Sequence, residues 1–120
     1  MIQESGEMYL ETILLLSRKK PDLHAIDISD EMKFSKPSIS RALGRLKAEG
    51  CIIINEDNHI YLTDKGRQIA ENIYEKHEVI SKLLMSLGVD EETATSDACK
   101  IEHVISDKTC AAIKAKCNLK

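Results

Sequence analysis

The sequence predicts a mainly α-helical protein with one small β-hairpin. Aromatic residues make up only 3% of the 120 residues and Trp is absent, so the core must be built from Ile, Leu, Met and Ala, which favours helices over a β-sandwich. Apolar residues recur at helical spacing in most segments, and two short runs have the composition of β-strands. A chain of this length forms one compact unit or two small ones.

Three helices are predicted in the first fifty residues. Segment 7–18 repeats apolar residues at helical spacing, which gives a helix with one buried face, and Ser5 is a suitable N-cap. A turn that contains Pro21 follows, and a short helix of about residues 26–33 comes next.

The third helix begins after a tight turn. Ser35 is placed to cap it, and Pro37 is tolerated in its first turn because the amides there have no intrahelical partner. Gly50 is the expected C-terminal stop. Three aliphatic residues share one face of this helix and are expected to be buried: Ile39, Leu43 and Leu46.

A β-hairpin is predicted directly after the third helix. Two β-rich runs, residues 51–55 and 59–63, are separated by the polar turn Glu56-Asp57-Asn58. A helix-turn-helix followed at once by a hairpin is the winged-helix arrangement. We therefore predict a winged helix-turn-helix domain over residues 1–62.

Three more helices are predicted after the hairpin, at about residues 64–87, 90–104 and 107–116. Thr63 and Asp90 are the expected N-caps of the first two, and Gly88 is the expected stop of the long one. Because a small aliphatic core leaves dimerisation as a further source of buried area, residues 63–120 are predicted to form a helical dimerisation domain.

Charge is divided unevenly along the chain, and this division matters more than the net charge of −3. Five cationic residues and no acidic residue lie between positions 33 and 47: Lys33, Lys36, Arg41, Arg45 and Lys47. Between positions 90 and 102 the acidic residues outnumber Lys100: Asp90, Glu91, Glu92, Asp97 and Glu102. One part of the molecule suits phosphate, and the other suits cations.

The third helix is predicted to bind double-stranded DNA. Its first turn is rich in small polar groups, which allow close approach to bases and phosphates, and Arg41 is suited to guanine. The predicted DNA-binding residues are Lys33, Ser35, Lys36, Pro37, Ser38, Ser40, Arg41, Arg45 and Lys47. The alternative is a solvated basic helix face. The acidic turn of the hairpin is a poor phosphate contact, and His59 is the one cationic candidate near it.

Residues with metal-binding side chains occur at helical spacing in two segments. Cys99, Glu102 and His103 have the spacing i, i+3, i+4 and would project from one face of a single helix. Met8 and Glu11 are one turn apart on the first helix, and His77 lies in the middle of the long helix. Each grouping alone also has an ordinary structural explanation, because Met is usually a core residue.

Four segments resemble the diphtheria-toxin-repressor and manganese-transport-regulator family of metal-dependent repressors. They are EMYLETILLL, SKPSISRALGRLKAEG, LTDKGRQIAENIYEKHEVISKLL and DACKIEHVIS. The resemblance implies a repressor that binds operator DNA as a homodimer and controls metal homeostasis genes. The metal ligands that it implies are Met8, Glu11, His77, Cys99, Glu102 and His103.

The resemblance favours Fe(II), with Co(II), Ni(II) or Zn(II) as substitutes and Mn(II) as the alternative. Met8 with Cys99 is similar to the iron-dependent branch, and sulfur ligands suit a softer ion than Mn(II). These two residues would share one site with Glu102 and His103, Cys99 binding through its sulfur or its carbonyl oxygen. His77 would either build a neighbouring site with Glu11 and Glu102 or act as a hydrogen-bonding group.

The sequence also leaves other functions open. Cys51, Cys110 and Cys117 are expected to be free thiols in core or dimer packing, yet a regulator that senses thiol oxidation or an organic ligand is an alternative. A small metalloenzyme using Glu102 and His103 would leave the basic helix without a purpose. The sequence therefore predicts no enzyme and no organic substrate. It shows neither a secretion signal nor a membrane span, and the cytoplasm is the expected location.

Overall fold

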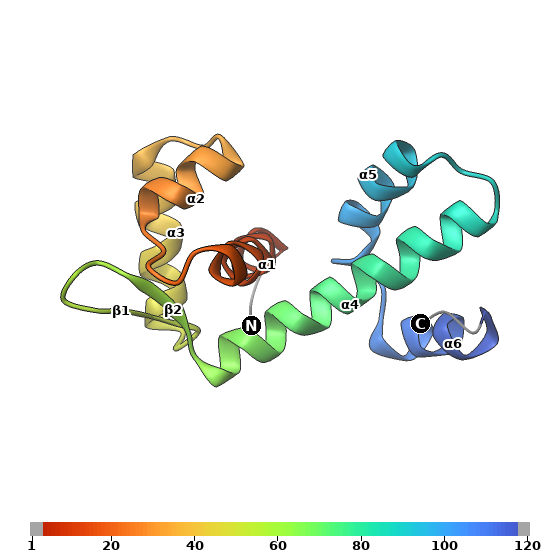
Figure 1. Cartoon of the computed structure of the whole chain (residues 1–120). Coiled ribbons are helices and arrows are strands. Elements are labelled where there is room, and N and C mark those ends of the chain that lie inside the picture. Colours follow the sequence, from red (N-terminus) through yellow and green to blue (C-terminus); the bar gives the residue numbers. More distant parts are fainter. Residues whose placement is uncertain (1–3, 118–120) are drawn as a thin grey trace. The chain divides into compact units, whose positions relative to one another are not determined.

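The protein is described by a computed structural model that covers residues 4–117 (Figure 1). Its elements, in chain order, are α1 (Glu4–Lys19), α2 (Ala25–Met32), α3 (Lys36–Ala48), β1 (Ile52–Ile54), β2 (Ile60–Leu62), α4 (Asp64–Ser86), α5 (Glu91–Ile101) and α6 (Asp107–Cys117). The two strands form one antiparallel sheet. The predicted mainly α-helical fold with a winged helix-turn-helix is confirmed.

The chain divides into two compact units, with the division between Glu71 and Asn72, inside α4. The first unit contains α1 to α3 and the hairpin, and the second contains the rest of α4 with α5 and α6. Among the described residues, no helix is both long enough and apolar enough to cross a membrane.

The first unit is built around aliphatic side chains from its helices and its hairpin. In α1, Leu10, Ile13 and Leu14 are fully buried. In α3 the three residues predicted to share a buried face, Ile39, Leu43 and Leu46, are at most 4% exposed. Since each buried aliphatic side chain contributes about 1.5–3 kcal/mol, this core fixes how α3 is held against α1 and the hairpin.

Local capping fixes the start of α3. The Ser35 hydroxyl accepts a hydrogen bond from the Ser38 amide at 3.3 Å, and Pro37 occupies the first turn, as predicted. Lys33 adopts a left-handed conformation with φ 59° and turns the chain sharply between α2 and α3. This is the turn of the helix-turn-helix.

Thr63 joins the hairpin to α4. Its hydroxyl accepts from the Gly66 amide at 3.1 Å, which confirms the predicted cap, and donates to the Gly50 carbonyl at 2.6 Å. At Gly66 a Cβ atom would lie 2.0 Å from the Cys51 carbonyl oxygen. Only glycine therefore allows α4 to start so close to β1.

In the second unit, α4 is tied to the segment that follows α5. Lys76, 8% exposed, donates to the Ile105 carbonyl at 3.1 Å and forms an ion pair with Asp107 at 2.8 Å. The hydrogen bond from Lys76 lowers the pKa of Asp107. The predicted cap of α5 is confirmed, because Asp90 accepts from the Thr93 amide at 2.9 Å.

Two predicted details are wrong. Ser5 is not an N-cap, because α1 already includes it. The acidic helix ends at Ile101 and not near residue 104, because the chain tightens there: the His103 amide bonds to the Lys100 carbonyl three residues back. Glu102 is consequently the C-cap of α5, and His103 lies in the turn after it.

A carboxylate supports the start of α2. Asp27 accepts from the His24 amide at 2.8 Å and from the Lys20 ammonium at 3.0 Å. The hydrogen bond from the His24 backbone is the largest cause of the lowered pKa of Asp27. An acid whose pKa is lower in the folded state stabilises the fold above its ordinary value of 3.8, and this contribution disappears as the pH falls through the lower folded value.

We predict that Asp27→Asn lowers the free energy of unfolding by about 1 kcal/mol at neutral pH, the usual scale of a capping interaction. Thermal unfolding followed by circular dichroism between neutral and strongly acidic pH measures this. The difference from the wild type should vanish in acid, where Asp27 is protonated. Asp30→Asn, at an exposed position of the same helix, is the control. An equal loss in both variants, or a difference that persists in acid, would contradict the assignment.

Candidate metal centre

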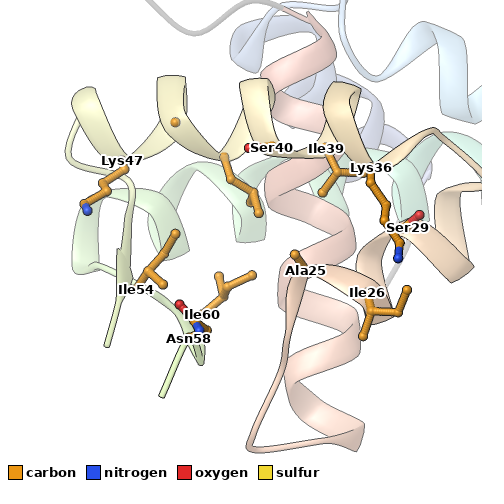
Figure 2. Close-up of a pocket in the computed structure, with 12 residues that line it drawn as sticks. Ala25, Ile26, Ser29, Lys36, Ile39, Ser40, Lys47, Ile54, Asn58 and Ile60 are labelled. Carbon is orange, nitrogen blue, oxygen red and sulfur yellow. The ribbon is translucent and has the colours of Figure 1, made fainter. Parts of the chain in front are cut away.

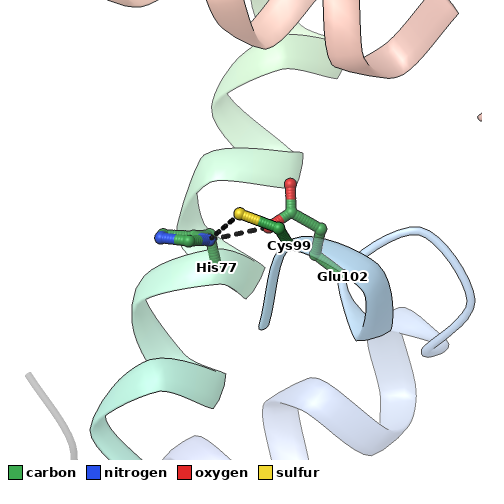
Figure 3. Close-up of side chains that lie close together, drawn as sticks. All are labelled: His77, Cys99 and Glu102. Carbon is green, nitrogen blue, oxygen red and sulfur yellow. Dashed lines mark hydrogen bonds and ion pairs between the residues drawn. The ribbon is translucent and has the colours of Figure 1, made fainter. Parts of the chain in front are cut away.

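Three of the six predicted ligands converge in the second unit (Figure 3). His77 comes from α4, Cys99 from α5 and Glu102 from the C-cap of α5. The nitrogen, sulfur and oxygen atoms that they offer all lie within 4.8 Å of one another. The His77 Nδ1 atom is 2.8 Å from Glu102 Oε1 and 3.8 Å from Cys99 Sγ.

Glu102 is the buried member of this cluster, with 1% of its side chain exposed. Its Oε1 atom contacts His77, but its Oε2 atom has no hydrogen-bond partner within the described part of the chain. The His103 Nε2 atom lies 3.6 Å from Oε2, beyond hydrogen-bond distance, and the His103 side chain is also 1% exposed. A buried carboxylate oxygen without a hydrogen bond is costly, and a bound cation beside it would remove that cost.

The donor set fits a divalent transition metal. Imidazole and thiolate suit Fe(II), Co(II), Ni(II) and Zn(II), whereas Mg(II) and Ca(II) are bound by oxygen ligands. His77, Cys99 and Glu102 supply one nitrogen, one sulfur and one oxygen donor from two helices. The cluster therefore meets the chemical requirements of a metal centre.

The place of His77 was left open by the sequence. Cys99, Glu102 and His103 were predicted to share one site with Met8, and His77 was predicted either to build a neighbouring site with Glu11 and Glu102 or to act as a hydrogen-bonding group. In the structure, the His77 ring contacts both Cys99 and Glu102. Spacing along the chain could not show this, because His77 is 22 residues away from Cys99.

The two remaining predicted ligands belong to the first unit. Met8 and Glu11 lie one turn apart on α1. Met8 is 39% exposed and Glu11 is half-buried. Their part in metal binding is taken up with the proposed function.

The predicted DNA-binding residues lie on α3 and in the turn that precedes it. Ser38 is half-buried and the other eight are exposed: Lys33, Ser35, Lys36, Pro37, Ser40, Arg41, Arg45 and Lys47. The Ser38 hydroxyl accepts from the Ser35 hydroxyl at 2.9 Å and from the Arg41 guanidinium at 3.4 Å. This small network links Arg41 to the first turn of α3.

All four cysteines are free thiols. Cys51 and Cys110 are buried, and burial raises the pKa of both thiols. Because the thiolate is the oxidisable form, these two cysteines are poor sensors of oxidation. Cys99 and Cys117 are exposed, and Cys99 belongs to the cluster with His77 and Glu102.

A winged helix-turn-helix fold combined with a candidate metal centre is typical of metal-dependent DNA-binding regulators. Comparison with known proteins identifies the family. The N-terminal DNA binding domain of the iron dependent repressors matches residues 1–60, and their metal binding and dimerisation domain matches residues 63–118. The chain belongs to the iron-dependent repressor family. Both descriptions are those of a repressor and not of an enzyme, in agreement with the prediction that the chain has no catalytic role.

Relatives of this chain include both iron and manganese regulators. The chain is 31% identical to the iron-dependent repressor IdeR of Mycobacterium tuberculosis (strain ATCC 25618 / H37Rv), over 87% of this chain and 46% of that protein. It is 30% identical to the transcriptional regulator MntR of Escherichia coli O157:H7, over 88% of this chain and 68% of that protein. The chain thus spans about half the length of the iron-dependent relatives.

Solved structures show the same fold. The manganese regulator SloR matches with a TM-score of 0.85 and 27% identity, over 96% of this chain and 54% of that chain. A structure of ScaR with bound Zn²⁺ matches with a TM-score of 0.81 and 26% identity, also over 96% of this chain and 54% of that chain.

Cobalt(II) tests the role of the Cys99 sulfur. We predict that Co(II) bound to the wild-type chain gives a thiolate-to-metal charge-transfer absorption, and that Cys99→Ser removes it because an alcohol oxygen replaces the sulfur. Cys117→Ser changes the other exposed cysteine and should leave the band intact. An undiminished band in Cys99→Ser would exclude sulfur coordination by Cys99.

Proposed function

We propose that this chain is a transcriptional repressor that binds operator DNA as a homodimer when loaded with Fe(II), and so controls genes of metal homeostasis. The observation that carries the proposal is the buried Glu102 oxygen without a hydrogen bond, next to His77 and Cys99. Family membership supplies the second support, because the matching domains are described as DNA binding and as metal binding and dimerisation. The relatives named above come from bacteria, whose DNA lies in the cytoplasm, and the proposal places this chain there too.

The proposed ligand set contains donors from both units. They are Met8, Glu11, His77, Cys99, Glu102 and His103. Glu102 contacts His77 through Oε1 and directs Oε2 toward His103, so one carboxylate can serve two adjacent ions or one ion and a hydrogen bond. If His77 binds an ion directly, each subunit can hold two metals. If His77 only donates a hydrogen bond to Glu102, each subunit holds one.

Iron is preferred over manganese on the chemistry of the donors. A thioether at Met8 and a thiol at Cys99 suit Fe(II), whereas Mn(II) prefers oxygen ligands. A manganese-responsive regulator is the second candidate, and the similarity to MntR and to the manganese regulator SloR favours it. Sensing of thiol oxidation has less support, because burial protects Cys51 and Cys110.

The metal would act by linking the two units. Without a cation, Glu11 and Glu102 repel one another and the units sample many relative orientations. With a cation held between α1 and the end of α5, the two α3 helices of a dimer are kept at one spacing, which has to match half-sites about 34 Å apart or a multiple of that. Metal and DNA then raise each other's affinity by the same factor.

Anaerobic binding of duplex DNA, titrated with Fe(II) and Mn(II) and reversed by a chelator, tests the proposal. We predict that the wild type binds DNA only with metal. Glu102→Gln should lose this metal-dependent DNA binding, because a neutral amide replaces the charged carboxylate that is proposed to bind the metal. The affinity for the metal should fall at least about tenfold, since the loss of even a hydrogen-bond partner of a metal ligand costs that much. Glu92→Gln changes an exposed carboxylate of the same helix and is the control.

If DNA binding is unchanged by metal and by chelator but changes with peroxide, the chain senses thiol oxidation and the proposal is wrong. A full metal response in Glu102→Gln would exclude Glu102 as a ligand. Far-ultraviolet circular dichroism and the mass of the particle in solution, both expected to stay unchanged, separate loss of metal binding from loss of fold.

Met8 is proposed to set the choice of metal. We predict that Met8→Asp shifts the activating ion from Fe(II) toward Mn(II), because a carboxylate oxygen replaces the thioether. The measurement is the ratio of the Fe(II) and Mn(II) concentrations that give half-maximal DNA binding. Met85→Asp, a change at an equally exposed methionine of α4, is the control. An unchanged ratio in Met8→Asp would remove this residue from the selectivity argument.

A further inference from the structure

A hollow of about 670 Å³ lies between α2, α3 and the hairpin of the first unit (Figure 2). Three of the predicted DNA-binding residues, Lys36, Ser40 and Lys47, are among the residues that line it. The predicted contact with DNA therefore accounts for this hollow. In the second unit, by contrast, one aromatic contact beside the metal centre involves a residue that belongs neither to the predicted DNA-binding residues nor to the six proposed ligands.

That residue is Tyr74, whose ring stacks on the ring of His77. Tyr74 lies three residues before His77 on α4, so the two side chains are on the same face of the helix. Their ring centroids are 6.3 Å apart, and their ring planes are inclined by 16°. Offset parallel aromatic rings attract one another at centroid distances of about 4.5–7 Å. The contact therefore stabilises one orientation of the two rings.

Core packing does not explain the tyrosine at this position. Within the second unit, Ile73 and Ile80 lie on the buried side of α4 and are each 2% exposed, whereas Tyr74 is half-buried. At a half-buried position of a helix, Leu, Met and Ala all have a higher helix propensity than Tyr. The contact with the His77 ring is a physical reason for an aromatic residue here.

The contacts of His77 restrain different motions of its ring. Its Nδ1 atom is 2.8 Å from Glu102 Oε1 and 3.8 Å from Cys99 Sγ (Figure 3). Contacts at one ring nitrogen still allow a range of ring tilts, because the χ2 torsion of histidine has a broad preference. The stacked ring of Tyr74 restrains this tilt. Since both rings are carried by α4, the restraint does not depend on α5 or on a bound ion.

We propose that Tyr74 is a positioning residue of the metal centre. Its ring holds the His77 imidazole in the orientation in which Nδ1 faces Glu102 and Cys99, so less rotational freedom is lost when an ion binds. The inference rests on the proposed function, and it applies whether His77 binds the ion directly or supports Glu102 through a hydrogen bond. It adds to the site a residue that is not itself a ligand.

The affinity of the full chain for Co(II), measured anaerobically from the absorption of the bound ion, tests the role of the ring. Tyr74→Leu should weaken Co(II) binding about threefold to tenfold, the scale of a stacked aromatic pair. Tyr74→Phe keeps an aromatic ring and should bind Co(II) within about twofold of the wild type. Tyr61→Leu is the control, because it removes a tyrosine of β2 that also lies beside a histidine, with ring centroids 6.5 Å apart. Its affinity for Co(II) should equal that of the wild type.

The ring-proton resonances of His77 in the metal-free protein give a second measurement, assigned by comparison with His77→Gln. The ring current of the stacked residue should displace these resonances in the wild type and in Tyr74→Phe, and Tyr74→Leu should remove the displacement. Far-ultraviolet circular dichroism should be the same in all variants.

Two outcomes would overturn the inference. One is a wild-type spectrum without the displacement of the His77 resonances. The other is an affinity for Co(II) that is as high in Tyr74→Leu as in the wild type, or as low in Tyr74→Phe as in Tyr74→Leu. If the wild type itself binds no Co(II), the proposed function fails, and the inference fails with it.

Discussion

The buried carboxylate of Glu102 is the constraint on which the rest of the molecule depends. One of its oxygens contacts the His77 ring at 2.8 Å, and the other is buried without a hydrogen bond. Lys76, the neighbour of His77 on α4, holds the turn beyond Glu102 through the Ile105 carbonyl. The same stretch of α4 thus positions both a ligand and the turn that carries Glu102 and His103. A buried carboxylate oxygen without a hydrogen bond costs free energy, the His103 ring lies 3.6 Å from it, and a bound cation is a compensation that this donor set fits.

Phosphate-binding and metal-binding side chains are found mainly in different units. Five cationic residues of the first unit lie on α3 or in the turn before it, where phosphate is the expected partner, and three donors for a metal meet between α4 and the end of α5. Met8 and Glu11 are the exception, because they are proposed metal ligands located in the first unit. If a metal is held by donors from both units, the relative orientation of the units depends on the metal concentration. DNA binding would then depend on metal through that orientation.

Most of the fold could be predicted from the sequence because its determinants are local. Ser35, Thr63 and Asp90 cap the helices that follow them, and the aliphatic face of α3 is buried as its spacing requires. The end of α5 was misplaced, because nothing in the spacing of Cys99, Glu102 and His103 reveals that the helix tightens at Lys100. The contact of His77 with Cys99 joins residues that are far apart in sequence, and it leaves no periodic signal in the chain.

A crystal structure of the full chain grown anaerobically with excess Fe(II), with ions located by anomalous scattering at the iron edge, tests the central claim most directly. The account predicts an iron within about 2.0–2.5 Å of a donor atom from Met8 or Glu11 and also of donor atoms from Glu102 or His103. Iron bound by residues of the second unit alone, with the side chains of α1 too far away to reach it, would contradict the account.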